Sequence, residues 1–166
     1  MPRRMRTPGK AGRTATPAQQ LAGFIGRFEP AIGRLVHAAC TALRKRFPTA
    51  NQLVYDNYNA LAIGFSSTDR VSDVLLSLAV YARGVNLYFM YGARLPDPQH
   101  VLKGSGNRGR FIPLDSVAVL GRPAVAALIG AAVRQAKTPL GRTGRGRLLI
   151  KSVSKKQRPR RPVAAA

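Results

Sequence analysis

The chain has 166 residues, 45% of them hydrophobic, which suits one domain with its own core and is too apolar for a wholly disordered protein. Its 28 Lys and Arg residues oppose six Asp and Glu, for a net charge of +22, so an anionic partner is the first class to consider. The single cysteine, Cys40, excludes an internal disulfide framework and a cysteine-rich zinc site. Two histidines and six carboxylates leave few ligands for a metal, and no cofactor is predicted.

No targeting signal stands out in the sequence. Residues 1–26 contain arginines but no apolar segment in front of a cleavage site, as a secretory signal requires. The longest apolar run, Pro123 to Val133, is shorter than the roughly 20 residues that span a bilayer. We therefore expect a cytoplasmic protein with no membrane span.

The positive charge is concentrated at the two ends of the chain. Residues 1–18 and 141–166 together hold fourteen of the 28 basic residues and none of the acids, and both are rich in Pro, Gly and small residues. This composition predicts disordered basic tails at 1–15 and 154–166 around a domain at 16–153. The tails either keep the protein soluble or bind nucleic acid or another polyanion through its phosphates.

Two helices are predicted in the first third of the chain. Thr16 followed by Pro17 is typical of a helix N-cap, and apolar residues then recur at helical spacing. Pro30 begins a second amphipathic helix, with Glu29 beside its positive end and Pro48 marking its end.

The pattern then changes to strands, with apolar runs and period-two alternation. The predicted strand segments are 53–58, 61–66, 74–82, 85–91 and 108–114. Residues 82–84 (Ala-Arg-Gly) are expected to join the third and fourth segments as a hairpin, with the third as a central strand. Pro113 places the last segment at an edge of the sheet or ends it there.

The C-terminal third predicts one more helix, beginning at Pro123 and closed by Pro139 and Gly141. Residues 147–153 form either a last short strand or the base of the tail. The order of these segments predicts an α+β fold, an antiparallel sheet of about five strands with helices packed on it.

A glycine-rich stretch is the first candidate site. Its glycines let a backbone approach an anion, its successive N–H groups can form a nest, and its cations suit phosphate. The candidate anion-binding residues are Lys103, Gly104, Ser105, Gly106, Arg108 and Arg110. It is not a Walker loop, because the lysine precedes the glycines and a strand follows. The alternative is a purely structural loop leading into that strand.

A second candidate site is the run Tyr55, Asp56, Asn57 and Tyr58. A carboxylate and two phenols could line a pocket. Alternatively, Asp56 forms an ion pair with an arginine, as expected of a rare acid in a strongly positive chain, and the tyrosines are half-buried.

No catalytic residue is predicted. Cys40 lies beside the apolar stripe of the second helix and is expected to be a small core residue. His37 lies off that stripe and should face solvent, and no Ser, His and acid are linked in the sequence.

Four stretches together resemble the YdhG-like family of small bacterial domains of unknown function, over about 16–161. They are YDNYNAL from Tyr55, VNLYF from Val85, GARLPDP from Gly92 with LKGSG from Leu102, and GRLLIKSVS from Gly146. The resemblance implies a compact α+β domain with helices against an antiparallel sheet. One branch of the family has been called frataxin-like, which implies an iron chaperone for iron–sulfur assembly.

The function expected from these observations is a non-enzymatic binding domain for an anionic partner: a nucleic acid, a phosphorylated ligand or an acidic protein. The alternative is the frataxin-like iron role, against which stands the scarcity of carboxylates, because hard cations need clustered oxygen ligands. No residue of this chain is therefore assigned as an iron ligand from the resemblance. A third hypothesis is an enzyme that uses the Asp56 pocket.

Overall fold

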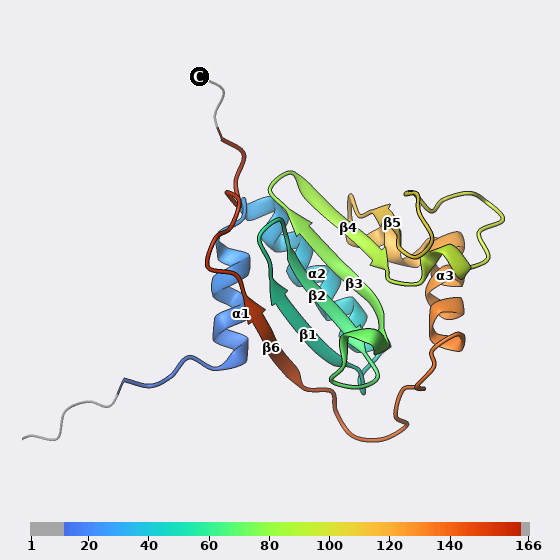
Figure 1. Ribbon diagram of the computed structural model, residues 1–166, viewed down its shortest axis with the longest axis horizontal. Coiled ribbons are helices and arrows are strands. Elements are labelled where there is room, and N and C mark those ends of the chain that lie inside the picture. Colours follow the sequence, from blue (N-terminus) through green and yellow to red (C-terminus); the bar gives the residue numbers. More distant parts are fainter. Residues whose placement is uncertain (1–11, 164–166) are drawn as a thin grey trace, which may run out of the picture.

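The structure is a computed structural model that describes residues 12–163. In this part of the chain, three α-helices pack on one six-stranded sheet with the strand order β5-β4-β3-β2-β1-β6, which confirms the α+β fold (Figure 1). The strands are β1 (Asn51–Asp56), β2 (Leu61–Ser66), β3 (Val74–Tyr81), β4 (Gly84–Phe89), β5 (Arg110–Pro113) and β6 (Leu148–Val153). No helix within the described residues has the length and apolar character that crossing a membrane demands.

The helices begin where the sequence predicts. Helix α1 (Pro17–Gly26) has a complete capping box, in which the Thr16 hydroxyl accepts from the Gln19 amide and the Gln19 side chain accepts from the Thr16 amide. Helix α2 (Pro30–Arg46) and helix α3 (Pro123–Arg134) both start with proline, whose fixed φ suits the first turn. The helix starts are therefore encoded locally.

One face of the sheet packs against the helices and forms the core. Alternate strand residues such as Ile63, Phe65, Leu78 and Leu87 point to this face and are fully buried. Figure 1 shows α2 behind the sheet. At about 25 cal/mol per Å² of apolar surface removed from water, this face is the main source of stability.

The opposite face carries a different set of side chains. Ala62, Gly64, Ser77 and Ala79 are paired across β2 and β3 and point away from the helices, because the residues that alternate with them lie in the core. Leu53 is fully buried yet lies outside the main core cluster, so it belongs to this second face. None of the three α-helices covers β1 to β4 from the front in Figure 1, but Leu53, Gly64 and Ser77 are buried on this face.

The two edge strands are β5 and β6, and the sequence predicts the first better than the second. Strand β5 is an edge strand that ends at Pro113, as predicted. Residues 148–153 form a strand rather than the base of a tail, and β6 pairs in parallel with β1, from Gln52 with Leu148 to Asp56 with Val153. The sheet thus has six strands and is mostly, not wholly, antiparallel.

Helix α3 is shorter than the sequence predicts. It ends at Arg134, and the Ala136 amide donates to the Val133 carbonyl in a tightened last turn, so Pro139 and Gly141 lie beyond its end. Proline disfavours the helical conformation of the residue before it. Thr138 precedes Pro139 and is therefore excluded from the helix. The chain then leaves α3 and runs to the far edge of the sheet to begin β6 (Figure 1).

The predicted boundary at residue 153 also needs correction. Arg160 is buried and ion-paired with Asp56, so the segment that follows β6 packs against the domain instead of forming a disordered tail. The sequence does not indicate which of the many arginines pairs with the buried Asp56, so the burial of Arg160 could not be predicted. Residues 1–11 and 164–166, which include most of the predicted N-terminal tail, lie outside the described residues.

Candidate functional site

The glycine-rich stretch forms a loop beyond the β5 edge of the sheet. The backbone of Lys103 pairs with that of Phe111, with N···O distances of 2.8 and 3.0 Å. Gly104 and Gly106 have φ values of +112° and +94°, which only glycine adopts readily. Arg110 donates to the carbonyl of Gly106 at 2.9 Å, so this arginine holds the loop itself.

Two of the predicted anion-binding cations remain exposed, Lys103 and Arg108. The Arg108 guanidinium lies over the ring of Tyr91, 5.5 Å from its centroid. Tyr91, Arg94, Asn107 and Arg108 line a cavity of about 350 Å³, which we call the Arg108 cavity. Arg108 thereby connects the loop to the end of β4.

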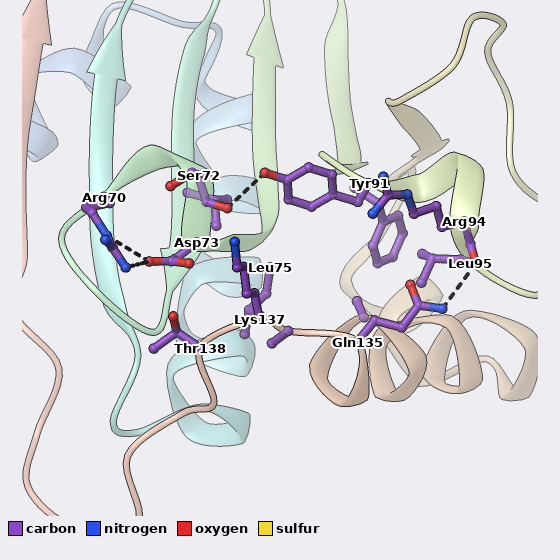
Figure 2. A pocket seen from close by; sticks show the side chains of 14 residues that line it. Arg70, Ser72, Asp73, Leu75, Tyr91, Arg94, Leu95, Gln135, Lys137 and Thr138 are labelled. Atoms are coloured by element: carbon purple, nitrogen blue, oxygen red, sulfur yellow. Dashed lines mark hydrogen bonds and ion pairs between the residues drawn. The ribbon is translucent and has the colours of Figure 1, made fainter.

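A larger cavity of about 460 Å³, which we call the Tyr91 pocket, shares Tyr91 and Arg94 with the Arg108 cavity. It lies where the start of β3, the end of β4 and the end of α3 meet (Figure 2). Its lining comprises Arg70, Ser72, Asp73, Val74, Leu75, Phe89, Tyr91, Arg94, Leu95, Ala132, Gln135, Ala136, Lys137 and Thr138. Two hydrogen bonds fix its walls: Tyr91 Oη donates to the Ser72 carbonyl at 2.9 Å, and Gln135 Nε2 donates to the Arg94 carbonyl at 3.1 Å.

The Tyr91 pocket carries an excess of positive charge. Arg70 is neutralised by Asp73, with a distance of 2.9 Å between Nη2 and Oδ2. Within residues 12–163, by contrast, no ion pair involves Arg94 or Lys137. Figure 2 shows Lys137 rising from the segment after α3, with its amino group pointing into the pocket. The pocket therefore presents cations whose charge no carboxylate of the described chain cancels.

Asp73 is held as a carboxylate at the rim of this pocket. The Thr68 hydroxyl, which donates to Oδ2 at 2.7 Å, lowers the pKa of Asp73 the most, and the hydrogen bonds and charge of Arg70 lower it further. Because this network occupies the carboxylate, Asp73 is a structural acid here rather than a general base.

We expect this interaction to make stability depend on pH. A folded-state pKa below the ordinary value of 3.8 gives a stabilising contribution that is complete above that value and is lost as the pH falls through the folded-state pKa. In urea unfolding, wild type should exceed Asp73→Asn in unfolding free energy at about pH 7, and the gap should shrink at about pH 2.5. Asp69→Asn, a change at an exposed neighbour, should show no such gap. A gap of constant size would mean that the Asp73 charge is not involved.

The second predicted site is not brought together. Asp56 faces the helices with no exposed surface, paired with Arg27 and Arg160, whereas Tyr55 lies on the opposite face. Asn57 and Tyr58 lie in the turn after β1, and Tyr58 is 49% exposed. Asp56 thus forms an ion pair, as the second interpretation predicted. The four residues lie on and after β1, four strands away from β5 and the glycine-rich loop.

Cys40, His37 and the possible metal-binding residues were the remaining candidates for a reactive site. Burial raises the pKa of the Cys40 thiol to about 12, against a smaller opposite effect of Arg44, so the thiol is an inert core group. His37 is exposed, as predicted. Among the described residues, no three His, Cys, Asp or Glu side chains gather where a metal ion could be held.

Sequence reasoning missed the Tyr91 pocket. Its cations come from three separated segments, with Arg70 before β3, Arg94 after β4 and Lys137 after α3, and none of them belongs to a motif. Only Arg108, in the glycine-rich loop, pointed toward this part of the molecule. No family model matches the chain, and no curated protein or solved structure matches it either.

Proposed function

We propose that this protein is a non-enzymatic binding protein for an anionic partner, and that the anionic group binds in the Tyr91 pocket. The observation that supports this most directly is that Arg94 and Lys137 line the pocket without a carboxylate partner among the described residues, with Arg108 in the adjoining cavity. Charge-assisted hydrogen bonds from such cations are about twice as strong as neutral ones. Of the three partner classes expected from the sequence, a phosphorylated ligand fits the pocket best.

The size and lining of the pocket support this choice. Its volume of about 460 Å³ lies within the 300–1,000 Å³ that is typical of small-molecule sites. Arg94 and Lys137 would contact the phosphate, while Leu75, Phe89 and Leu95 offer an apolar wall for the rest of the ligand. A surface that receives an acidic protein would be flatter and wider.

Three further expectations belong to this proposal. The resemblance to the YdhG-like bacterial domains and a cytoplasmic location are retained from the sequence. The frataxin-like alternative is not favoured, because iron would need clustered oxygen ligands and the described residues offer no such cluster. The Asp56 enzyme is not favoured either, because two arginines occupy that carboxylate.

The proposal is tested by thermal unfolding with inorganic phosphate and pyrophosphate, against sodium chloride at equal ionic strength. A ligand at a hundred times its Kd stabilises the folded state by about 2.7 kcal/mol, which in a protein of this size raises Tm by roughly 5–10 °C. We expect the variant with Arg94→Gln and Lys137→Gln to lose most of that rise.

The matched control removes the same two charges elsewhere. Arg34 and Lys45 are exposed on α2 and line none of the cavities described above, so Arg34→Gln with Lys45→Gln should keep the full rise. Lys137 also lies just past the negative end of α3, where it offsets the helix dipole. If the pocket variant has a lower Tm but gains as much from pyrophosphate as the wild type, that structural role is the whole explanation.

A further inference from the structure

The front face of the sheet is a platform of small residues bordered by aromatic ones. Across the middle strands the face consists of Ala62 and Ala79, which are partly exposed, and of Gly64 and Ser77, which are buried. Aromatic side chains with partial or larger exposure stand around them, and since they alternate with core residues they share this face. These are Tyr55 on β1, Tyr81 on β3, Tyr88 on β4 and Phe111 on β5.

Two of these rings form a pair. Tyr88 and Phe111 are directly opposite in the register of β4 and β5, where side chains come within about 5 Å of each other. Tyr55 lies three strands away on β1, which at about 4.8 Å per strand is roughly 14 Å. The rings are therefore spaced across the sheet rather than gathered into a core.

The glycine-rich loop borders this platform. A Cβ on Gly109 would lie 2.0 Å from the hydroxyl oxygen of Tyr88, so a side chain at this position would have to push the Tyr88 ring aside. The backbone of Lys103 is paired with that of Phe111. The loop thus places the exposed Lys103 at the edge next to the Tyr88–Phe111 pair, while Arg108 lies over Tyr91.

The other borders of the platform are also basic. Arg83 is exposed in the β3–β4 turn, and Arg158 lies over the ring of Tyr58 beside the β1–β2 turn, at the same end of the sheet. Lys151 is exposed on β6 and donates to the Asp69 carbonyl at 3.0 Å. The strand residues on this face include no carboxylate, because Asp56, the one acidic strand residue, faces the helices.

From this arrangement we infer that the front face of the sheet binds single-stranded nucleic acid, with bases stacked on Tyr88, Phe111 and Tyr55 and phosphates contacting the bordering cations. An aromatic platform on a sheet inside a positive border is the arrangement that single-stranded nucleic acid requires, because every base offers a π-face for stacking. Duplex bases are already stacked on one another and cannot reach these rings. This inference does not depend on the Tyr91 pocket, which lies at another part of the sheet.

The test uses the full chain and fluorescence anisotropy with labelled oligo(dT) and oligo(rU) of about 10 nucleotides, and with a duplex of equal length, at about 0.15 M salt. We expect tighter binding of the single strands than of the duplex, and about tenfold weaker binding for Tyr88→Ala and for Tyr55→Ala. Tyr88→Phe keeps the ring and should bind as the wild type does. Comparing the two oligonucleotides separates a ribose from a deoxyribose preference.

Two further measurements separate stacking from charge attraction. The chain has five Tyr and no Trp, so stacked bases should quench its tyrosine fluorescence, and Tyr88→Ala should reduce the quenching. The pocket variant with Arg94→Gln and Lys137→Gln should keep most of the single-strand affinity, so that failure of either proposal is distinguishable. Where Tyr88→Ala does not fold, Tyr88→Leu replaces it.

The inference is overturned if the alanine or leucine variants, shown to be folded by their melting curves, bind the single strands as tightly as wild type. Equal affinity for duplex and single strand, with no change in tyrosine fluorescence, overturns it as well. Such a result would assign the binding to charge alone, as the net charge of +22 would provide it.

Discussion

Replacing Asp56 with alanine should lower the free energy of unfolding by about 3–5 kcal/mol. Asp56 has no exposed surface, and the side chain of Arg160, whose guanidinium donates to Oδ1 at 2.8 Å, is only 4% exposed. Arg27 approaches the other carboxylate oxygen from the surface. Removing the carboxylate leaves the Arg160 charge buried without its counter-ion, which costs more than the loss of a surface ion pair.

The remaining contacts of Arg160 cannot replace that carboxylate. Its Nη2 also donates to the Asn57 carbonyl at 2.6 Å, and its guanidinium lies 5.6 Å from the ring centroid of Phe28. Its Nε is buried and has no hydrogen-bond partner among the described residues. The buried arginine already lacks one bond in wild type, so it has little capacity to compensate for another loss.

Urea unfolding measures this effect, with Asp69→Ala as the control. Asp69 is exposed, so its replacement should change the unfolding free energy by less than about 0.5 kcal/mol. The double variant with Asp56→Ala and Arg160→Ala should be less destabilised than the sum of the two single variants, because neither charge is then left alone. If Asp56→Ala matches the Asp69 control, the ion pair does not contribute to folding.

The second large effect is expected for Gly146→Ala, at roughly 3 kcal/mol or more. A Cβ on Gly146 would lie 1.7 Å from the Ala50 carbonyl oxygen, and backbone cannot move aside as a flexible side chain can. The Gly146 amide donates to the Pro48 carbonyl at 2.9 Å, and the Arg147 amide donates to Asn51 Oδ1. These bonds set the start of β6 against β1, so the extra methyl group pushes the start of β6 away from β1.

Gly23→Ala is the matched control for this prediction. Gly23 lies within α1, and a Cβ there would meet nothing within 4 Å. Because glycine costs a helix interior about 0.5–1 kcal/mol relative to alanine, this variant should be slightly more stable than wild type. Thermal unfolding compares the Tm of the two variants. If Gly146→Ala and Gly23→Ala have a similar Tm, the structure around Gly146 accommodates the methyl group without cost.

The helix starts and the antiparallel strands could be predicted because their signals are local. Thr16, Pro30 and Pro123 mark helix starts through φ angles and capping groups that depend on a few neighbours. The alternation of Leu61, Ile63 and Phe65 follows directly from one buried face. The predicted end of α3 was wrong. Pro139 and Gly141 show only that the helix cannot continue past them, and it ends earlier, at Arg134.

The parallel strand and the candidate sites depend on distant partners. Nothing near residues 148–153 indicates that they pair with β1, almost a hundred residues earlier. The Tyr91 pocket joins cations from three separate segments, and the burial of Arg160 depends on Asp56, 104 residues away. The glycine-rich loop was recognised from composition, but its position beside Tyr88 depends on the register of β4 and β5.

The pairing of β6 with β1 has a consequence for synthesis on the ribosome. Between the two strands lie roughly 90 residues, which take on the order of 5–20 s to translate. During that interval the outer edge of β1 has unpaired backbone groups, and such an edge is a template for pairing with another chain. The long loop that β6 must close also delays the last folding step relative to the local hairpins. A chain released before residue 148 therefore has an open β1 edge and no Arg160 beside the Asp56 charge, which exposes it to aggregation and chaperone capture.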